Sequence, residues 1–164
     1  MSKPPGDRTS FGSNTYFVTA STWGHRSLFQ TERTSRLFID TLCRYRGAQK
    51  FLLHEFVVMP DHFHLLLTPL EITLERAVQL VKGGFSYGVR RELGLNMEIW
   101  ERGYIDHRIR DANDYAQHVA YTQRNPVQAR IACAAEEYPY SSAHPGFDLD
   151  PCPQGLKPTS LQIA

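Results

Sequence analysis

The chain has 164 residues, of which 41% are hydrophobic and 21% charged, with a formal net charge of +1 at pH 7. This length favours a single domain with a substantial core, the composition excludes an intrinsically disordered chain, and the near-neutral charge taken alone argues against a strongly basic nucleic-acid binder. No apolar run approaches the roughly 20 residues of a membrane span, and residues 1–6 lack the apolar segment of a signal peptide, so we expect a cytoplasmic protein with no membrane partner.

The first half of the chain predicts three strands and one helix. Residues 14–20 and 50–58 have strand composition, and residues 62–68 predict a third strand that pairs antiparallel with the second across a proline-containing turn. Between the first two strands, Thr31 is a good N-cap for a helix, and Gly47 supplies its end.

A longer helix is predicted from residue 73 to about 92, although Gly83, Gly84 and Gly88 should weaken or break its second half. Cations and aromatic residues around flexible backbone are typical of a surface that binds phosphates and stacks on unpaired bases. The simpler alternative is the solvated end of an amphipathic helix. The candidate DNA-binding residues in this stretch are Lys82, Phe85, Arg90 and Arg91.

Residues 104–110 alternate well enough to predict a fourth strand, and Asp111 and Asp114 stand at capping spacing before a last helix that runs through Tyr121. Two further DNA-binding candidates in this stretch are Arg108 and Arg110. After residue 131 the prolines argue against long helices. We expect this tail either to wrap the domain or to block its site.

Two histidines lie one residue apart in the apolar run of residues 55–67. Successive side chains of a strand point to opposite faces, so His62 and His64 share one face while Phe63 and Leu65 share the other. Two neutral imidazoles on a stiff strand make half of a site for a divalent cation. A pair satisfied by hydrogen bonds at a strand end is an equal alternative, so the pair alone is a weak signal.

The last predicted helix adds a second group of polar residues. Tyr121 and Asn125 are four residues apart and so lie on one helix face, with His118 three positions before Tyr121. A phenol and an amide oxygen on one face can both reach a metal ion. Taken separately, the simpler alternatives are favoured: Asn125 as the N-cap of a new helix that begins at Pro126, and Tyr121 as a packing residue.

Together these segments resemble the HUH tyrosine transposases, and within them the REP-associated branch. The segments that carry the resemblance are residues 57–64, 82–86, 100, 104–111, 121–127 and 138–142. The resemblance implies an α+β, ferredoxin-like fold: a βαββαβ antiparallel sheet with its helices on one face, His-x-His on a central strand and the nucleophilic tyrosine on a late helix. The predicted element order agrees with this fold. Residues 1–131 would form the catalytic domain and residues 132–164 a proline-rich extension.

The same resemblance implies residue roles. His62, His64 and Asn125 would be the metal ligands for Mg²⁺ or Mn²⁺, and Tyr121 the nucleophile. Apart from the resemblance, His118 is a candidate accessory residue because it is near Tyr121 in the sequence. Some relatives carry Gln where this chain has Asn125, and because Asn is one methylene shorter we expect the last helix to lie closer to the sheet.

The implied activity is cleavage and rejoining of single-stranded DNA at REP-like hairpins through a 5′-phosphotyrosine intermediate. Relatives occur as monomers and as homodimers, so the tyrosine could act within its own chain or on a partner. One alternative is a domesticated protein that binds DNA hairpins without cleaving them. Another is an unrelated metal-dependent hydrolase built on the same His-x-His pair.

Overall fold

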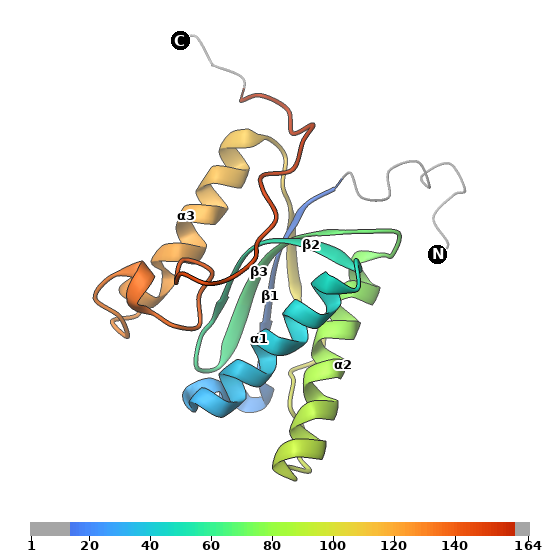
Figure 1. Ribbon diagram of the computed structural model, residues 1–164, viewed down its shortest axis with the longest axis vertical. Helices are drawn as coiled ribbons and strands as arrows, with labels where there is room; N and C mark the ends of the chain where they lie inside the picture. Colours follow the sequence, from blue (N-terminus) through green and yellow to red (C-terminus); the bar gives the residue numbers. More distant parts are fainter. Residues whose placement is uncertain (1–13, 160–164) are drawn as a thin grey trace.

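The computed structural model describes residues 14–159. Its strands and helices follow the predicted order, with short 3-10 turns between some of them (Figure 1). The strands are β1 (Tyr16–Ser21), β2 (Phe51–Val58), β3 (His62–Pro69) and β4 (Ile105–Arg108). The helices are α1 (Glu32–Gly47), α2 (Leu74–Leu93) and α3 (Ala112–Gln128), and the 3-10 turns are η2 (Trp23–His25), η3 (Leu28–Gln30) and η4 (Ala135–Glu137).

The four strands form one antiparallel sheet in the order β2-β3-β1-β4. This order and the βαββαβ connectivity confirm the predicted ferredoxin-like fold. The two histidines lie on β3, which is an inner strand, and the register places His64 opposite Thr19 of β1. An inner strand is held by hydrogen bonds along both edges, so it is a rigid support for the two imidazoles.

The two faces of the sheet are covered by different helices (Figure 1). Val18 and Phe63 point into the main hydrophobic core, which α1 and α2 complete. Phe17 and His64 point to the opposite face, where Phe17 meets residues of α3. The two helices of the ferredoxin-like repeat therefore share one face, as predicted, and α3 covers the other, so the candidate site lies under α3.

The glycines were predicted to weaken or break the second helix; the break is wrong, because α2 is continuous from Leu74 to Leu93. Two of its three interior glycines lie where α2 packs on α1. A Cβ added at Gly84 would lie 2.9 Å from Cε2 of Tyr45, and one added at Gly88 would lie 3.2 Å from Cδ1 of Leu37. The close approach of the two helices offsets the low helix propensity of these glycines.

Helix α3 continues past Tyr121 to Gln128, with Pro126 inside it. The alternative in which Asn125 caps a new helix is therefore wrong. Asn125 lies within the helix, where its amide side chain has no capping role, and it is half-buried.

The segment after α3 runs along the free edge of β2 (Figure 1). The Val58 N–H donates to Tyr140 O, the Ser142 N–H to Phe56 O, and the Asp150 N–H to Leu53 O. Further along, Lys157 O accepts from the N–H of Ala112 at the start of α3. As far as residue 159 the tail therefore wraps the domain, in accordance with the first of its two predicted arrangements. In the described part of the chain no helix is long and apolar enough to cross a bilayer.

Candidate active site

His64 is the most deeply placed polar residue of the candidate site. Its side chain is 4% exposed, and its Nδ1 is hydrogen-bonded to Oγ1 of Thr19 at 2.7 Å. Its Nε2 is buried and has no hydrogen-bond partner among the described residues. A buried polar atom without a partner is costly, so this nitrogen is the clearest structural sign of a ligand-binding position.

His62 lies beside it, with the two ring centroids 4.9 Å apart. Its Nδ1 donates to Oδ1 of Asp61 at 2.7 Å. A carboxylate that accepts from one imidazole nitrogen fixes the tautomer and leaves the lone pair of the other nitrogen available, an arrangement common around metal-binding histidines.

The imidazole of His64 is held neutral. Burial, and then the proximity of His62, lowers its pKa to about 3. A neutral imidazole has a free lone pair, which is the form that binds a metal ion. Two imidazole nitrogens, the orphaned Nε2 of His64 and the Nε2 of His62, suit a divalent cation.

Tyr121 reaches this pair from α3 of the same chain. Its ring centroid lies 5.4 Å from that of His64, and its side chain is 43% exposed. Three of the predicted site residues, His62, His64 and Tyr121, are thus brought together. Asn125 lies one turn beyond Tyr121 on α3, as its spacing requires.

Phe17 is a residue of this site that the sequence did not reveal. Its ring stacks on His64 at 5.1 Å and 18°, and it also contacts His118 at 4.8 Å and Tyr121 at 5.8 Å. Phe17 is therefore the platform on which the three side chains meet. In the sequence it is one of several strand aromatics, and only the pairing of β1 between β3 and β4 gives it this position.

Comparison with known proteins identifies the family of this chain. The sequence model of the family described as "Transposase IS200 like" matches residues 13–125. The chain belongs to the IS200-like transposase family. It is 26% identical to the REP-associated tyrosine transposase of Escherichia coli K12 over 132 residues, covering 79% of this chain and 76% of that protein. A Haemophilus influenzae protein provisionally given the same name is 28% identical over 131 residues, covering 69% and 74% of the two chains.

A solved structure also resembles this chain. It is a REP-associated tyrosine transposase bound to a REP hairpin, with a TM-score of 0.68 and 24% identity, and the match covers 87% of this chain and 82% of that one. At this level of identity the likeness shows a shared fold. It agrees with the ferredoxin-like sheet described above.

The structure contradicts one of the DNA-binding candidates and gives another a structural role. Phe85 is fully buried among Phe29, Phe38 and Trp100, so its ring cannot stack on a base. Nζ of Lys82 donates to Glu101 O at 3.0 Å and to Gly103 O at 2.8 Å, and burial lowers its pKa. The Lys82 ammonium therefore holds the loop before β4.

The remaining four candidates are exposed arginines. Arg90 and Arg91 lie near the C-terminal end of α2, on the side of the sheet away from His64. Arg108 ends β4, and Arg110 precedes the Asp111 cap of α3, so both lie near the helix that carries Tyr121. Position thus favours Arg108 and Arg110 over the α2 pair as contacts for a substrate of this site.

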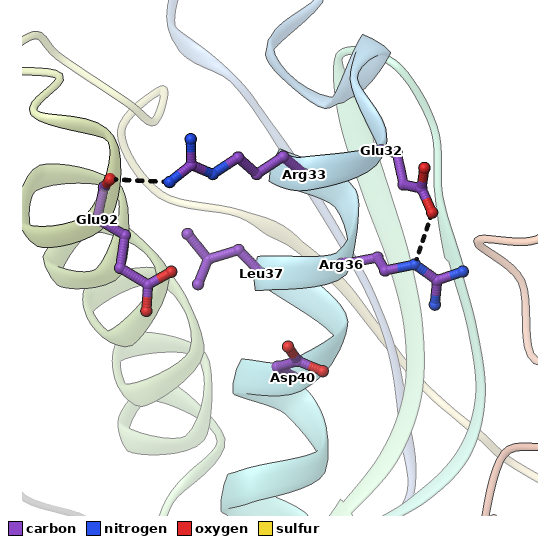
Figure 2. A pocket seen from close by; sticks show the side chains of 6 residues that line it. All are labelled: Glu32, Arg33, Arg36, Leu37, Asp40 and Glu92. Atoms are coloured by element: carbon purple, nitrogen blue, oxygen red, sulfur yellow. Dashed lines mark hydrogen bonds and ion pairs between the residues drawn. The ribbon is translucent and has the colours of Figure 1, made fainter.

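A groove of about 490 Å³ lies between α1 and α2, on the face opposite the candidate site (Figure 2). Its charges are mixed: Arg36 pairs with the carboxylate of Glu32 at 3.0 Å, and Arg33 donates to the backbone carbonyl of Glu92 at 3.1 Å. The groove is open and contains none of the site residues, so we assign the chemistry to the α3 face.

Proposed function

We propose that this transposase cleaves and rejoins single-stranded DNA at hairpin sequences through a 5′-phosphotyrosine on Tyr121. The observation that carries the proposal is the buried Nε2 of His64, which has no partner among the described residues and lies beside the Tyr121 ring. Metal-assisted phosphoryl transfer to tyrosine requires a metal-binding nitrogen and an exposed phenol close to each other.

His62, His64 and Asn125 would hold the cation, and Mg²⁺ or Mn²⁺ suits the set because zinc sites usually add a carboxylate, a thiolate or a third histidine. When bound, the ion would polarise the scissile phosphate and stabilise the charge that develops during transfer. Asp61 and Thr19 orient the two imidazoles through their Nδ1 atoms.

Tyr121 supplies the nucleophile. Its hydroxyl oxygen forms a bond to phosphorus while the bond from phosphorus to the 3′-oxygen breaks, the phenolic proton passes to solvent, and the 3′-oxygen leaves as a hydroxyl after it gains a proton. The phosphotyrosine is a phosphodiester like the one that was broken, so a DNA 3′-hydroxyl can reverse the step and rejoin the strand.

Three observations support the proposed substrate and the proposed action by a single chain. The solved REP-associated relative is described as bound to a REP hairpin, and two exposed arginines, Arg108 and Arg110, adjoin the Tyr121 helix. Tyr121 contacts His64 of its own chain, which favours action in cis by a single chain over an exchange of tyrosines in a homodimer.

The test uses labelled hairpin DNA from the flanks of the gene, with Mn²⁺ or with EDTA, analysed on denaturing gels. We expect a covalent adduct that requires Mn²⁺, is lost in Tyr121→Phe, and persists in the control Tyr87→Phe, which removes the hydroxyl of an exposed tyrosine on α2. Hairpin binding without an adduct would support the non-cleaving alternative. Cleavage that survives in Tyr121→Phe would make water the nucleophile and refute the proposal.

A further inference from the structure

A second cluster of metal-ligating side chains lies where β4 meets the first two turns of α3. Nε2 of His107 lies 2.8 Å from Oδ2 of Asp114, and Nδ1 of His118 lies 3.1 Å from Oδ1 of the same carboxylate. The two imidazoles stack with centroids 4.7 Å apart and an interplanar angle of 17°. One ligand atom from each residue lies within 4.8 Å of the other two.

Local structure fixes the carboxylate at the centre of this cluster. The Asp114 N–H donates to Oδ1 of the Asp111 cap, and Asp114 Oδ2 accepts from the N–H of Arg110. Asp114 is 7% exposed; burial alone would raise its pKa, but the Arg110 N–H and His107 outweigh burial and lower it. The centre of the cluster is therefore a buried, charged carboxylate with one imidazole on each oxygen.

We propose that His107, Asp114 and His118 bind a divalent transition-metal ion such as Zn²⁺ or Co²⁺, at a site separate from His62 and His64. Two imidazoles and one carboxylate are the protein ligands of open zinc sites, and nitrogen donors favour Zn²⁺ and Co²⁺ over Mg²⁺. Without an ion, the hydrogen bonds to Asp114 hold the three ligands together, and an ion would replace the protons between them.

Partial exposure leaves room for a fourth ligand. The His107 side chain is 38% exposed and that of His118 is 23% exposed, so the cluster can be approached from solvent while its carboxylate stays buried. Water or a phosphate oxygen would complete a tetrahedral set. The Phe17 ring contacts both His118 and His64, so the two sites are neighbours on the face covered by α3.

An ion at this cluster would also join two elements. His107 belongs to the four-residue edge strand β4, whereas Asp114 and His118 belong to the helix that carries Tyr121. The competing interpretation is a purely hydrogen-bonded network, since His118 Nδ1 also lies 2.8 Å from Asp114 O, to which it donates when protonated. Metal binding distinguishes the two.

The test counts Co²⁺ ions bound per full-length chain by native mass spectrometry, for wild type and for His107→Gln, Asp114→Asn and the control His144→Gln. His144 lies outside both sites and is hydrogen-bonded to Glu136 O. We expect His107→Gln and Asp114→Asn each to bind one ion fewer than wild type, and His144→Gln to match wild type. Equal counts in all four proteins would overturn the proposal.

A second measurement does not depend on counting. In a His62→Gln background, which weakens the first site, Zn²⁺ should raise the thermal unfolding temperature, and adding His107→Gln should abolish that increase. Circular dichroism without metal checks that each variant is folded. An increase that survives in the double variant would place the ion elsewhere. Neither assay uses DNA, so the result is independent of the proposed cleavage activity.

Discussion

The glycines of α2 allow a matched test of the packing between α1 and α2. Gly83 and Gly84 are neighbours in the same helix, and alanine at either position gains helix propensity of about 1 kcal/mol. A Cβ on Gly83 meets nothing within 4 Å, whereas one on Gly84 would lie 2.9 Å from Cε2 of Tyr45 and 3.0 Å from Cγ2 of Thr41. Thr41 is buried, β-branched and hydrogen-bonded to Leu37 O, so it cannot easily move away.

We therefore expect opposite signs. Gly83→Ala should stabilise the protein by about 1 kcal/mol. Gly84→Ala has the same gain in helix propensity but an overpacking cost of about 1–3 kcal/mol, so it should destabilise the protein by about 1 kcal/mol. Thermal unfolding followed by circular dichroism should separate the two variants by about 4–8 °C, because 1 kcal/mol shifts the midpoint by about 2–4 °C for a chain of this size. Equal unfolding temperatures would refute the packing argument.

Three further predictions concern the tail and the candidate site. Asp150→Asn should destabilise the protein by about 2 kcal/mol at pH 7, because the carboxylate accepts two hydrogen bonds from Arg46 at 2.9 and 3.0 Å. Burial would raise the pKa of Asp150, but the Arg46 hydrogen bonds outweigh burial and lower that pKa. The stabilisation is therefore full above about pH 4 and is lost as the pH falls below that value. Urea unfolding at several pH values should show the stabilities of the two proteins becoming equal in acid. Phe17→Leu should slow adduct formation about tenfold in single-turnover assays while hairpin affinity is retained, because the Phe17 ring positions Tyr121. An unchanged rate would show that Phe17 does not position the tyrosine. Asp61→Asn should weaken Mn²⁺ binding about 10- to 100-fold in electron paramagnetic resonance titrations, because the His62 Nδ1–H loses its carboxylate acceptor. Equal affinity would show that this carboxylate does not contribute to Mn²⁺ binding.

The parts of the site that could be predicted were those that local geometry determines. Alternation along a strand places His62 and His64 on one face, and helical spacing places Tyr121 and Asn125 one turn apart. The structure adds what no local pattern holds: α3 crosses the sheet so that Tyr121 meets His64. The metal-binding roles of His62, His64 and Asn125 stay predictions, as does the role of Tyr121 as nucleophile.

The predictions that the structure changes have non-local causes, with one exception. The α2 glycines look like helix breakers until α1 is packed against them, and the structural role of Lys82 depends on the loop before β4, whose carbonyl groups accept from its Nζ. Phe85 is the exception, because Val81, Phe85 and Val89 are spaced four residues apart and lie on one helix face. This spacing predicts that the three side chains lie on the buried face of the helix, and it is a stronger indication than the basic and aromatic composition of the surrounding residues.

The position of α3 over the site depends on contacts beyond the helix itself. Buried Glu55 of β2 accepts a hydrogen bond from Gln123 of α3 at 3.2 Å and another from Ser142 of the tail, and burial raises its pKa. Gln123 lies midway between Tyr121 and Asn125, so one carboxylate couples the tail, the sheet edge and the helix that carries the nucleophile. The tail also accepts a hydrogen bond from Ala112 at the start of α3, so it contacts this helix directly there and is linked to Gln123 through Glu55. The position of the Tyr121 ring beside His64 therefore depends on contacts of α3 with the sheet and the tail. The sequence around either residue alone does not determine it.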